Sequence, residues 1–246
     1  NILFMISQSG HLGDVILTAP AFQSIKDTWP EAKIDIFVGK KGLPALRLLP
    51  GYSDIIVEQA FPGILKTLNN LVNYQPPSKV YDLLLCFSEV ASTTVIAYKI
   101  RARKKIGYNW QGRGLFFDIS LKYRKNRINL KSLGLELVKQ AGCCIPSKIN
   151  LNYSCCEFEL LDSPYMVIHP GSTDPQKIWP VEKYEQVATM AKKRLGLTSV
   201  FIGTDAEKDL NSYLSKSSLG LDLSGKTTLE ELVFIIKNAK LFLGND

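Results

Sequence analysis

Short apolar runs alternate along the chain with longer segments in which apolar residues recur every three or four positions. The first run spans residues 2–6. The apolar residues that follow it at the wider spacing are Val15, Ile16, Ala19, Phe22 and Ile25. Short apolar runs are typical of strands buried on both faces, whereas the wider spacing is typical of helices. Because the two patterns alternate, the sequence predicts an α/β fold with a parallel, doubly wound sheet.

The pattern predicts specific elements as far as residue 141. Strands are expected at residues 2–6, 33–38, 54–57, 81–87, 104–108 and 116–121. Helices are expected after the first strand and at residues 64–72, 90–100 and 129–141. Pro20 falls inside the first helix, and proline lacks the N–H that a helix interior needs, so that helix should bend or restart there.

A second α/β unit follows. Residues 142–164 have weak periodicity and mixed polarity, which indicates a domain boundary there. We expect one domain at residues 1–155 and a second at residues 156–246. Beyond it, strands are expected at residues 165–169, 199–202, 220–223 and 241–243, and helices at residues 181–195, 206–214 and 229–238. The chain begins with Asn1 rather than Met and stops just after a predicted strand, so we expect the second domain to be incomplete.

A turn rich in Gly, Ser and Thr follows the first strand of the second domain. The dipeptide Pro170-Gly171 ends the strand, and Pro180 suits the first position of the next helix, where a missing N–H costs nothing. Backbone N–H groups and the positive end of the helix dipole meet at such a turn, and Ser172, Thr173 and Lys177 add hydroxyl donors and a positive charge. The turn is either a seat for a phosphate or diphosphate, or an ordinary loop with a solvated lysine.

A turn that contains glycine also follows the first strand of the chain. Gly10 and Gly13 lack the G-x-G-x-x-G spacing, so a bound NAD is not supported. Asp14 stands where the next helix begins. It can complement the helix N-terminus, which is the commoner role of such a residue, or it can act as a carboxylate at the strand edge where open α/β sheets bind ligands.

Residues 220–227 match the phosphate-binding pattern G-x-x-x-x-G-K-[ST], but their context disfavours a P-loop. In a P-loop the strand precedes the first glycine. Here Leu221 and Leu223 alternate with polar residues, so the strand is predicted inside the variable positions. Thr228 and Glu231 then have the spacing of a capping box that opens the next helix.

The composition is that of a globular chain with ample core, since 46% of its 246 residues are hydrophobic. No apolar run approaches the roughly 18 residues of a membrane-spanning helix, and the apolar start reads as a strand rather than a signal peptide. The five cysteines include two adjacent pairs and no C-x-x-C, which disfavours a disulfide framework or a zinc site and favours a reducing cytosol. With only two histidines, a histidine-built metal site is also disfavoured.

Positive charge is concentrated between residues 99 and 131, a segment we call the basic block. It contains eleven Lys and Arg residues and one acid, Asp118, so it carries a formal charge of +10 in a chain whose total is +7. A block of this size marks an anionic partner more often than it serves general solubility. Nucleic acid, an anionic membrane surface and an acidic glycolipid all fit, as does a merely solvated face.

Taken together and in order, these turns resemble glycosyltransferase family nine, the ADP-heptose:lipopolysaccharide heptosyltransferases and their relatives. The matching residues are Gly10-His-Leu-Gly-Asp14 with residues 15–17, Pro20 and Ala21; His169-Pro-Gly-Ser172 with Lys177-x-Trp179-Pro180; Ile202-Gly203 with Glu207; Leu223-Ser-Gly-Lys-Thr-Thr-Leu229; and Asn245-Asp246. Each motif alone is weak, but the ordered set is specific and spans nearly the whole chain. The family usually continues with a Gly and a His in the next helix, and this chain ends before them.

The resemblance implies a GT-B fold, in which two Rossmann-like domains face each other across a cleft, the first for the acceptor and the second for the nucleotide-sugar donor. It implies sugar transfer with inversion and without metal, and the sequence contains no Asp-x-Asp. Heptose from ADP-heptose is the family default. By the same resemblance, Asp14 is the general base that takes the proton from the attacking acceptor hydroxyl.

The resemblance also assigns binding roles by position. It places Ser172, Thr173, Lys177 and Asp246 at the donor diphosphate, Glu207 at the donor ribose, and Gly225, Lys226 and Thr227 at the nucleobase. In the acceptor half, the expected binding residues are Gly10, His11, Gly13, Arg101, Arg103, Lys104 and Lys105. No cofactor is expected, because the nucleotide sugar is a substrate.

The expected partners are a nucleotide-diphosphate sugar and an acidic glycolipid of the lipopolysaccharide-core type, and not nucleic acid. The basic block would serve both that glycolipid and the anionic inner face of the cytoplasmic membrane, which implies a cytoplasmic protein that contacts this face. Two other interpretations stay open. One is a non-catalytic binder of polyanions or membrane surfaces, and the other is a nucleotide-sugar epimerase or a P-loop enzyme.

Overall fold

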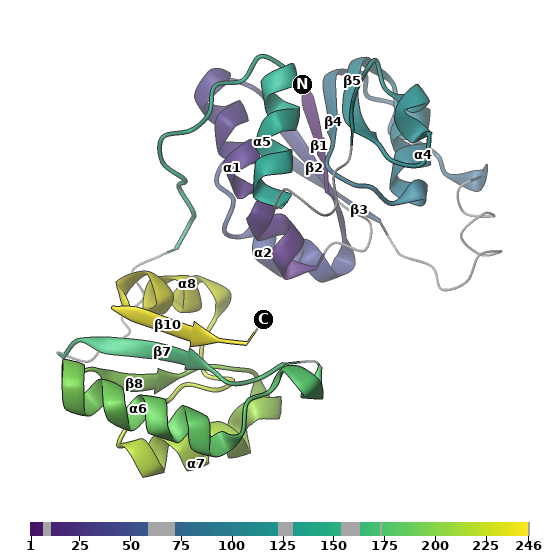
Figure 1. Ribbon diagram of the computed structural model, residues 1–246. Helices are drawn as coiled ribbons and strands as arrows, with labels where there is room; N and C mark the ends of the chain where they lie inside the picture. Colours follow the sequence, from purple (N-terminus) through teal and green to yellow (C-terminus); the bar gives the residue numbers. More distant parts are fainter. Residues whose placement is uncertain (7–10, 59–71, 123–129, 154–162, 173, 246) are drawn as a thin grey trace. The chain divides into compact units, whose positions relative to one another are not determined.

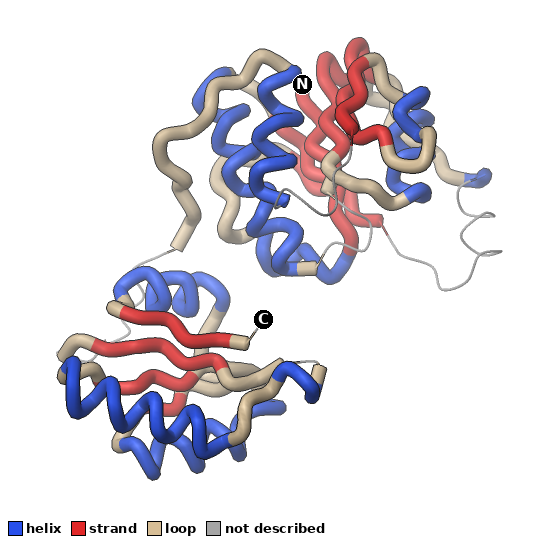
Figure 2. Tube along the Cα trace, viewed as in Figure 1, coloured by secondary structure: helices blue, strands red, loops and turns tan. Residues whose placement is uncertain are grey.

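A computed structural model describes residues 1–6, 11–58, 72–122, 130–153, 163–172 and 174–245 of the chain. The chain divides into two compact units, Asn1–Asn152 and Tyr153–Asp246 (Figures 1 and 2). The division falls within the aperiodic stretch, at residue 152 where the sequence suggested 155.

The first unit is built on a six-stranded parallel sheet with the order β3-β2-β1-β4-β5-β6 (Figure 1). Its strands are β1 (Ile2–Met5), β2 (Ile34–Gly39), β3 (Asp54–Glu58), β4 (Tyr81–Cys86), β5 (Ala102–Asn109) and β6 (Ile119–Lys122). The chain leaves β1 on one side for β2 and β3 and returns on the other side for β4, so the strand order reverses between β1 and β4. In open α/β sheets, ligands bind outside the carboxyl ends of the strands at such a switch point.

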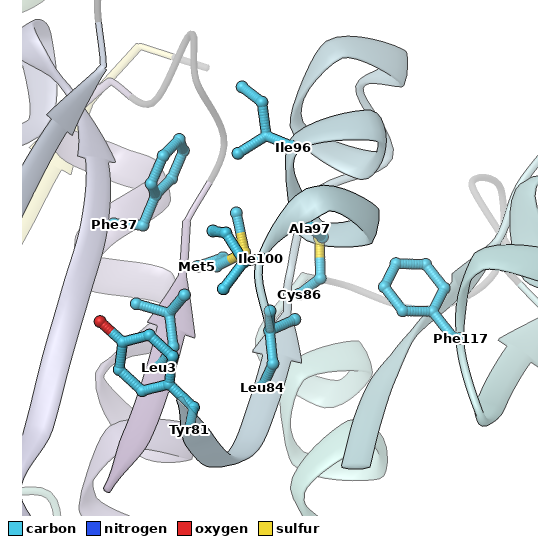
Figure 3. Close-up of a cluster of buried hydrophobic side chains, with 10 residues drawn as sticks. All are labelled: Leu3, Met5, Phe37, Tyr81, Leu84, Cys86, Ile96, Ala97, Ile100 and Phe117. Carbon is cyan, nitrogen blue, oxygen red and sulfur yellow. The ribbon is translucent and has the colours of Figure 1, made fainter. Parts of the chain in front are cut away.

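The two faces of this sheet contribute to two cores. Its helical segments are α1 (Leu12–Thr28), η1 (Lys40–Gly42), α2 (Leu43–Leu46), α4 (Ala91–Lys99), η2 (Arg113–Phe116) and α5 (Leu130–Gln140). Because successive strand residues point to opposite faces, Leu3 and Met5 pack in the cluster that contains Ile96 of α4 (Figure 3). Phe4 points the other way and contacts the ring of Phe22 from α1, with ring centroids 5.6 Å apart. The strand that leads to Asp14 is therefore held from both sides.

The second unit is a four-stranded parallel sheet with the order β10-β7-β8-β9 (Figure 1). Its elements are β7 (Tyr165–His169), η3 (Pro175–Lys177), α6 (Val181–Leu195), β8 (Thr198–Phe201), η4 (Asp205–Glu207), α7 (Lys208–Ser218), β9 (Leu221–Asp222), α8 (Leu229–Asn238) and β10 (Leu241–Gly244). The order repeats that of β4-β1-β2-β3 in the first unit. The switch point of this unit therefore lies between β7 and β10.

Alternate residues of β7 pack against different helices. Met166 and Ile168 join the cluster made with α6 and α7, whereas Val167 joins Ile235 of α8 on the other face. Helices on both faces are what a parallel sheet requires, because both of its faces are apolar. The prediction of a second α/β unit from the restarted alternation is thus confirmed.

Most expected elements form within two residues of their predicted limits, but the first helix differs from expectation. It does not restart at Pro20: α1 runs unbroken from Leu12 to Thr28. The residues around the proline explain this, because every position from Thr18 to Ile25 is buried. Packing on all sides of this part of α1 overrides the local cost of the missing hydrogen bond.

Two later elements are displaced from the predicted ranges. The strand expected at residues 116–121 begins only at Ile119, because Phe117 is used to fill the space over Gly107, whose added Cβ would lie 2.4 Å from that ring. The helix expected at residues 206–214 begins at Lys208 and continues to Ser218. The helix expected at residues 64–72 lies outside the described residues apart from Val72. In the part of the chain that the structure describes, no helix has the length and apolar character needed to cross a bilayer.

Candidate active site

The turn after β7 lies at the switch point of the second unit and is held by two other elements. Asn245, which follows β10, donates from Nδ2 to the carbonyl oxygens of Pro170 at 2.7 Å and Gly171 at 3.1 Å. Tyr184 of α6 donates its hydroxyl to Asn245 Oδ1 at 2.6 Å. Gly171 is buried and Ser172 is half-buried. The predicted phosphate-binding turn is therefore a fixed structure rather than a loose connection.

The turn after β8 contacts the turn after β7 through Glu207. Thr204 donates to Glu207 Oε2 from its N–H at 2.7 Å and from its hydroxyl at 2.6 Å, which caps η4. The hydrogen bond from the Thr204 side chain lowers the pKa of Glu207; burial acts in the opposite direction, and the nearby His169 again lowers it. A Cβ added to Gly171 would lie 2.6 Å from both Cγ and Oε1 of Glu207. The structure thus brings Glu207 against the turn that carries Ser172.

The turn after β9 joins the turn after β8. Gly225 adopts φ of 65°, and its N–H donates to the carbonyl of Gly203 at 3.0 Å. A Cβ on Gly225 would lie 2.3 Å from Oδ1 of Asp205, so no side chain fits there. Lys226 donates to the carbonyl of Asp222 at 2.8 Å, and Thr227 is half-buried. Three strand-end turns, after β7, β8 and β9, therefore form one continuous edge.

The pattern that resembles a P-loop has the structure predicted for it. Strand β9 occupies Leu221–Asp222, inside the variable positions, rather than preceding the first glycine. Thr228 is the N-cap of α8, and Thr228 and Glu231 form the expected capping box. The local context of a P-loop is thus not present at this sequence.

Lys177 belongs to the same hydrogen-bonded loop as Ser172. The N–H of Asp174 donates to Ser172 Oγ at 3.2 Å, and the Asp174 carboxylate accepts from Gln176 N at 3.0 Å, which starts the η3 turn that Lys177 ends. Lys177 itself is exposed. Thr173 and Asp246, also predicted to bind the diphosphate, lie outside the described residues.

Pro180 lies one position before the helical position predicted for it. It is the N-cap of α6, not its first helical residue, because its ψ of 138° is extended. The preceding N–H, of Trp179, donates to the Tyr184 hydroxyl at 3.3 Å, which brings the chain before the helix onto the first turn of α6.

In the first unit, Asp14 lies in the first turn of α1, the helix that follows β1 at the switch point. Its Oδ2 accepts the N–H of the N-cap residue His11 at 2.9 Å, so the commoner role of complementing a helix N-terminus is present. Asp14 is half-buried, and among the described residues no hydrogen bond to its Oδ1 is recorded. His11 and Gly13 are exposed, and a Cβ on Gly13 would meet nothing within 4 Å. Gly10 lies outside the described residues.

The basic residues predicted to bind the acceptor are not brought together with Asp14. Lys104 is in register with Leu83, which is in register with Ile2, so this part of β5 lies at the amino ends of the strands. Asp14 instead follows the carboxyl end of β1. Arg101 and Arg103 are at the same amino edge, where their partners are the carbonyl of Ser78 at 2.6 Å and the carboxylate of Asp82 at 3.4 Å, respectively. Lys105, one residue further along β5, donates to the carbonyl of Tyr98 at 2.7 Å.

Comparison with known proteins decides which family the chain belongs to. The family model described as glycosyltransferase family 9 (heptosyltransferase) matches residues 77–246. The chain belongs to glycosyltransferase family 9. It is therefore a glycosyltransferase, and both the suspected family and the enzyme class are confirmed.

Individual relatives agree with this assignment. The chain is 26% identical over 265 aligned residues to lipopolysaccharide heptosyltransferase 3 of Escherichia coli, with 95% of this chain and 75% of the relative covered. Among solved structures, the glycosyl transferase family 9 protein from Veillonella parvula has a TM-score of 0.75 and 21% identity, covering 99% of this chain and 74% of that one. The E. coli heptosyltransferase WaaC with ADP-2-deoxy-2-fluoro heptose has a TM-score of 0.74 and 18% identity, covering 100% and 82%. The likeness in fold confirms the predicted GT-B fold with two α/β units.

Proposed function

We propose that this family 9 glycosyltransferase moves heptose from ADP-heptose to an acidic, phosphorylated acceptor of the lipopolysaccharide-core type, with inversion at the anomeric carbon. Heptose, ADP and lipopolysaccharide are supported by the relatives, which include a lipopolysaccharide heptosyltransferase and a heptosyltransferase with ADP-2-deoxy-2-fluoro heptose. The observation that carries the proposal is the continuous edge formed by the turns after β7, β8 and β9 in a chain of this family. Such an edge at the carboxyl ends of parallel strands is suited to a nucleoside diphosphate.

The proposed reaction is a single displacement. The acceptor hydroxyl oxygen forms a bond to the anomeric carbon of the donor, the bond from that carbon to the diphosphate oxygen breaks, and the electron pair leaves with the diphosphate. The acceptor proton passes to Asp14. Oδ2 of Asp14 already accepts the N–H of His11 at 2.9 Å, so Oδ1 is the oxygen that takes the proton. Attack from the side opposite the leaving group gives inversion.

In this scheme the second unit binds the donor along its edge. Glu207 keeps Oε2 on Thr204 and offers Oε1 to the ribose hydroxyls, and the lowered pKa keeps it an acceptor. The turn of Gly225, Lys226 and Thr227 lies under the nucleobase. Ser172 and Lys177 stabilise the charge that builds on the leaving diphosphate, as donors aimed at developing charge do in other enzymes. The proposal requires no metal and no cofactor.

Replacing Lys177 with Ala is expected to weaken ADP binding about thirtyfold, the loss typical of a hydrogen bond to a charged group. The test is calorimetric titration of ADP, with transfer from ADP-heptose assayed alongside in the presence and absence of EDTA. Lys193→Ala is the matched control, because Lys193 is exposed in the last turn of α6, at the other end of that helix. Equal ADP affinity in the Lys177→Ala and wild-type proteins would contradict the diphosphate role, and loss of transfer in EDTA would contradict metal independence.

We further propose that the amino-edge cations Arg101, Arg103 and Lys104 contact an anionic membrane surface. The side chain of Arg103 is 80% exposed, and these residues belong to the basic block of charge +10. Because they do not lie at the edge that carries Asp14, they are better suited to a lipid surface than to the reacting hydroxyl. Contact with the inner face of the cytoplasmic membrane would bring the enzyme to a lipid-anchored acceptor.

The double substitution Arg103→Glu and Lys104→Glu is expected to weaken binding to vesicles with 30% anionic lipid by about 25-fold or more, at about 1 kcal/mol for each basic residue removed. Co-sedimentation measures this. The matched control is Lys193→Glu with Lys216→Glu, two exposed lysines of the second unit. Unchanged sedimentation of the first variant would contradict the surface role, and a raised KM for a delipidated acceptor would instead support the acceptor-binding role implied by the family resemblance.

A further inference from the structure

A single side-chain nitrogen donates to both carbonyl oxygens of the turn after β7. Asn245 Nδ2 lies 2.7 Å from the Pro170 oxygen and 3.1 Å from the Gly171 oxygen. Two successive carbonyls that accept from one atom must point to the same side of the chain. One amide thus contacts two adjacent peptide groups, and the Tyr184 hydroxyl is a second donor to the Pro170 oxygen at 3.4 Å.

The orientation of the carbonyls sets that of the N–H groups. In a trans peptide, the C=O of one residue and the N–H of the next point in opposite directions, and no peptide among the described residues is cis. The N–H groups of Gly171 and Ser172 therefore point away from Asn245, side by side. Among the described residues, no hydrogen bond from either N–H is recorded. Successive N–H groups directed at one point form an anion-binding concavity.

Tyr184 fixes the direction of the Asn245 amide. Its hydroxyl donates to Asn245 Oδ1 at 2.6 Å, so the amide nitrogen must face the turn. The Tyr184 side chain is only 1% exposed, its ring lies 5.8 Å from that of Trp179, and its oxygen accepts the Trp179 N–H at 3.3 Å. A ring held in this way cannot follow Asn245 if the amide rotates, so rotation would cost the partly buried hydrogen bond between them.

We propose that Asn245 and Tyr184 form a clamp that presents the N–H groups of Gly171 and Ser172 to the diphosphate of the donor. The inference rests on the proposed function, because the bound group is the diphosphate of the nucleotide sugar. Asn245 and Tyr184 are positioning residues that act through the turn. The leaving diphosphate gains charge in the transition state, so a misdirected turn lowers kcat as well as donor affinity and leaves the acceptor KM unchanged.

The test uses Tyr184→Phe, which removes one hydroxyl and keeps the packed ring, and Asn245→Ala, which removes the amide. Binding of ADP, adenosine and inorganic pyrophosphate is measured by calorimetry, together with kcat, both KM values and the melting temperature. We expect ADP and pyrophosphate affinity to fall about fivefold to tenfold in Tyr184→Phe, which keeps the Asn245 amide but no longer directs it. The fall should be larger in Asn245→Ala, which removes both hydrogen bonds to the carbonyls of the turn. Adenosine affinity should be unchanged, because adenosine lacks the diphosphate.

Two controls lie in the same unit. Tyr213→Phe changes a tyrosine that is 55% exposed on α7, and Asn238→Ala removes an exposed amide that bonds the carbonyl of Phe234 at 2.9 Å. Both should bind all three ligands as the wild type does. Wild-type affinity for ADP in Tyr184→Phe and Asn245→Ala, or an equal loss of ADP and adenosine, would overturn the clamp.

The outcome also separates the clamp from the proposed function. If the wild-type protein binds pyrophosphate through the clamp but neither binds ADP nor transfers heptose, the clamp stands and the proposed donor is wrong. If it binds ADP and transfers heptose with no effect of the two substitutions, the proposed function stands and the clamp is wrong. Failure to bind any diphosphate would overturn both.

Discussion

Replacing Asp14 with Asn is expected to lower the rate of heptose transfer about a thousandfold without unfolding the protein, a loss in the usual range for removal of a general base. Asparagine is the informative substitution because its side-chain oxygen can still accept the His11 N–H, now 2.9 Å from Asp14 Oδ2. The helix cap is kept, while the ability to take a proton is lost. The measurement is steady-state transfer from ADP-heptose, with ADP affinity determined in parallel and expected to be unchanged.

A matched substitution separates catalysis from helix capping. Glu231 occupies the same N3 position in α8, where its Oε2 accepts the N–H of Thr228 at 2.6 Å. Glu231→Gln should therefore affect stability as much as Asp14→Asn does, but leave transfer within about twofold. A folded Asp14→Asn protein that transfers heptose at the wild-type rate would reduce Asp14 to its capping role.

The periodicity of apolar residues predicted the order of the elements well. Strands and helices that pack against one another each carry apolar residues at a characteristic spacing, so the spacing identifies the element. It could not predict what lies around a residue in three dimensions. Pro20 is tolerated because α1 is buried around it, and Phe117 leaves the expected strand because Gly107 provides a place for its ring. Both differences are tertiary effects that override a local preference.

The candidate site was predicted only in part. The turns of Ser172, Glu207 and Gly225 do lie together, but the role of Asn245 and Tyr184 in holding the first of these turns was missed. Tyr184 fits the apolar face of a helix, so the pattern indicated only a core residue, and its hydroxyl contact with Asn245 joins positions 61 apart in the sequence. Such a contact has no local signature.

The amino-edge position of Arg101, Arg103 and Lys104 did have a signal in the sequence. The strand was predicted to begin at residue 104, so residues that precede it must lie at the amino edge of a parallel sheet. Asp14, which follows a strand, must lie near the opposite edge. Strand direction therefore tells at which edge of the sheet a residue lies, which its charge does not. For these basic residues it favours a surface-binding role over a role at the reacting centre.

Replacing Gly171 with Ala is expected to lower the rate of transfer about a hundredfold, because the new methyl group displaces the turn and Glu207 together. Its Cβ would lie 2.6 Å from Glu207 Cγ and Oε1. Glu207 cannot swing aside freely, since its Oε2 accepts from both the N–H and the hydroxyl of Thr204, at 2.7 and 2.6 Å. The strain should also lower the free energy of unfolding by about 2 kcal/mol, as overpacking does.

A double-mutant cycle identifies the cause of this loss. In a Glu207→Ala background the space beside Gly171 is empty, so adding Gly171→Ala should cost much less stability than it does in the wild type. Gly134→Ala in α5 is the control, because its Cβ would meet Ala21 and Phe87 at ordinary distances of 3.6 and 3.7 Å, and alanine favours a helix by up to about 1 kcal/mol over glycine. Equal costs of Gly171→Ala in both backgrounds would mean that Glu207 is not what the glycine accommodates. The requirement for glycine at the turn would then lie in the backbone that Asn245 holds.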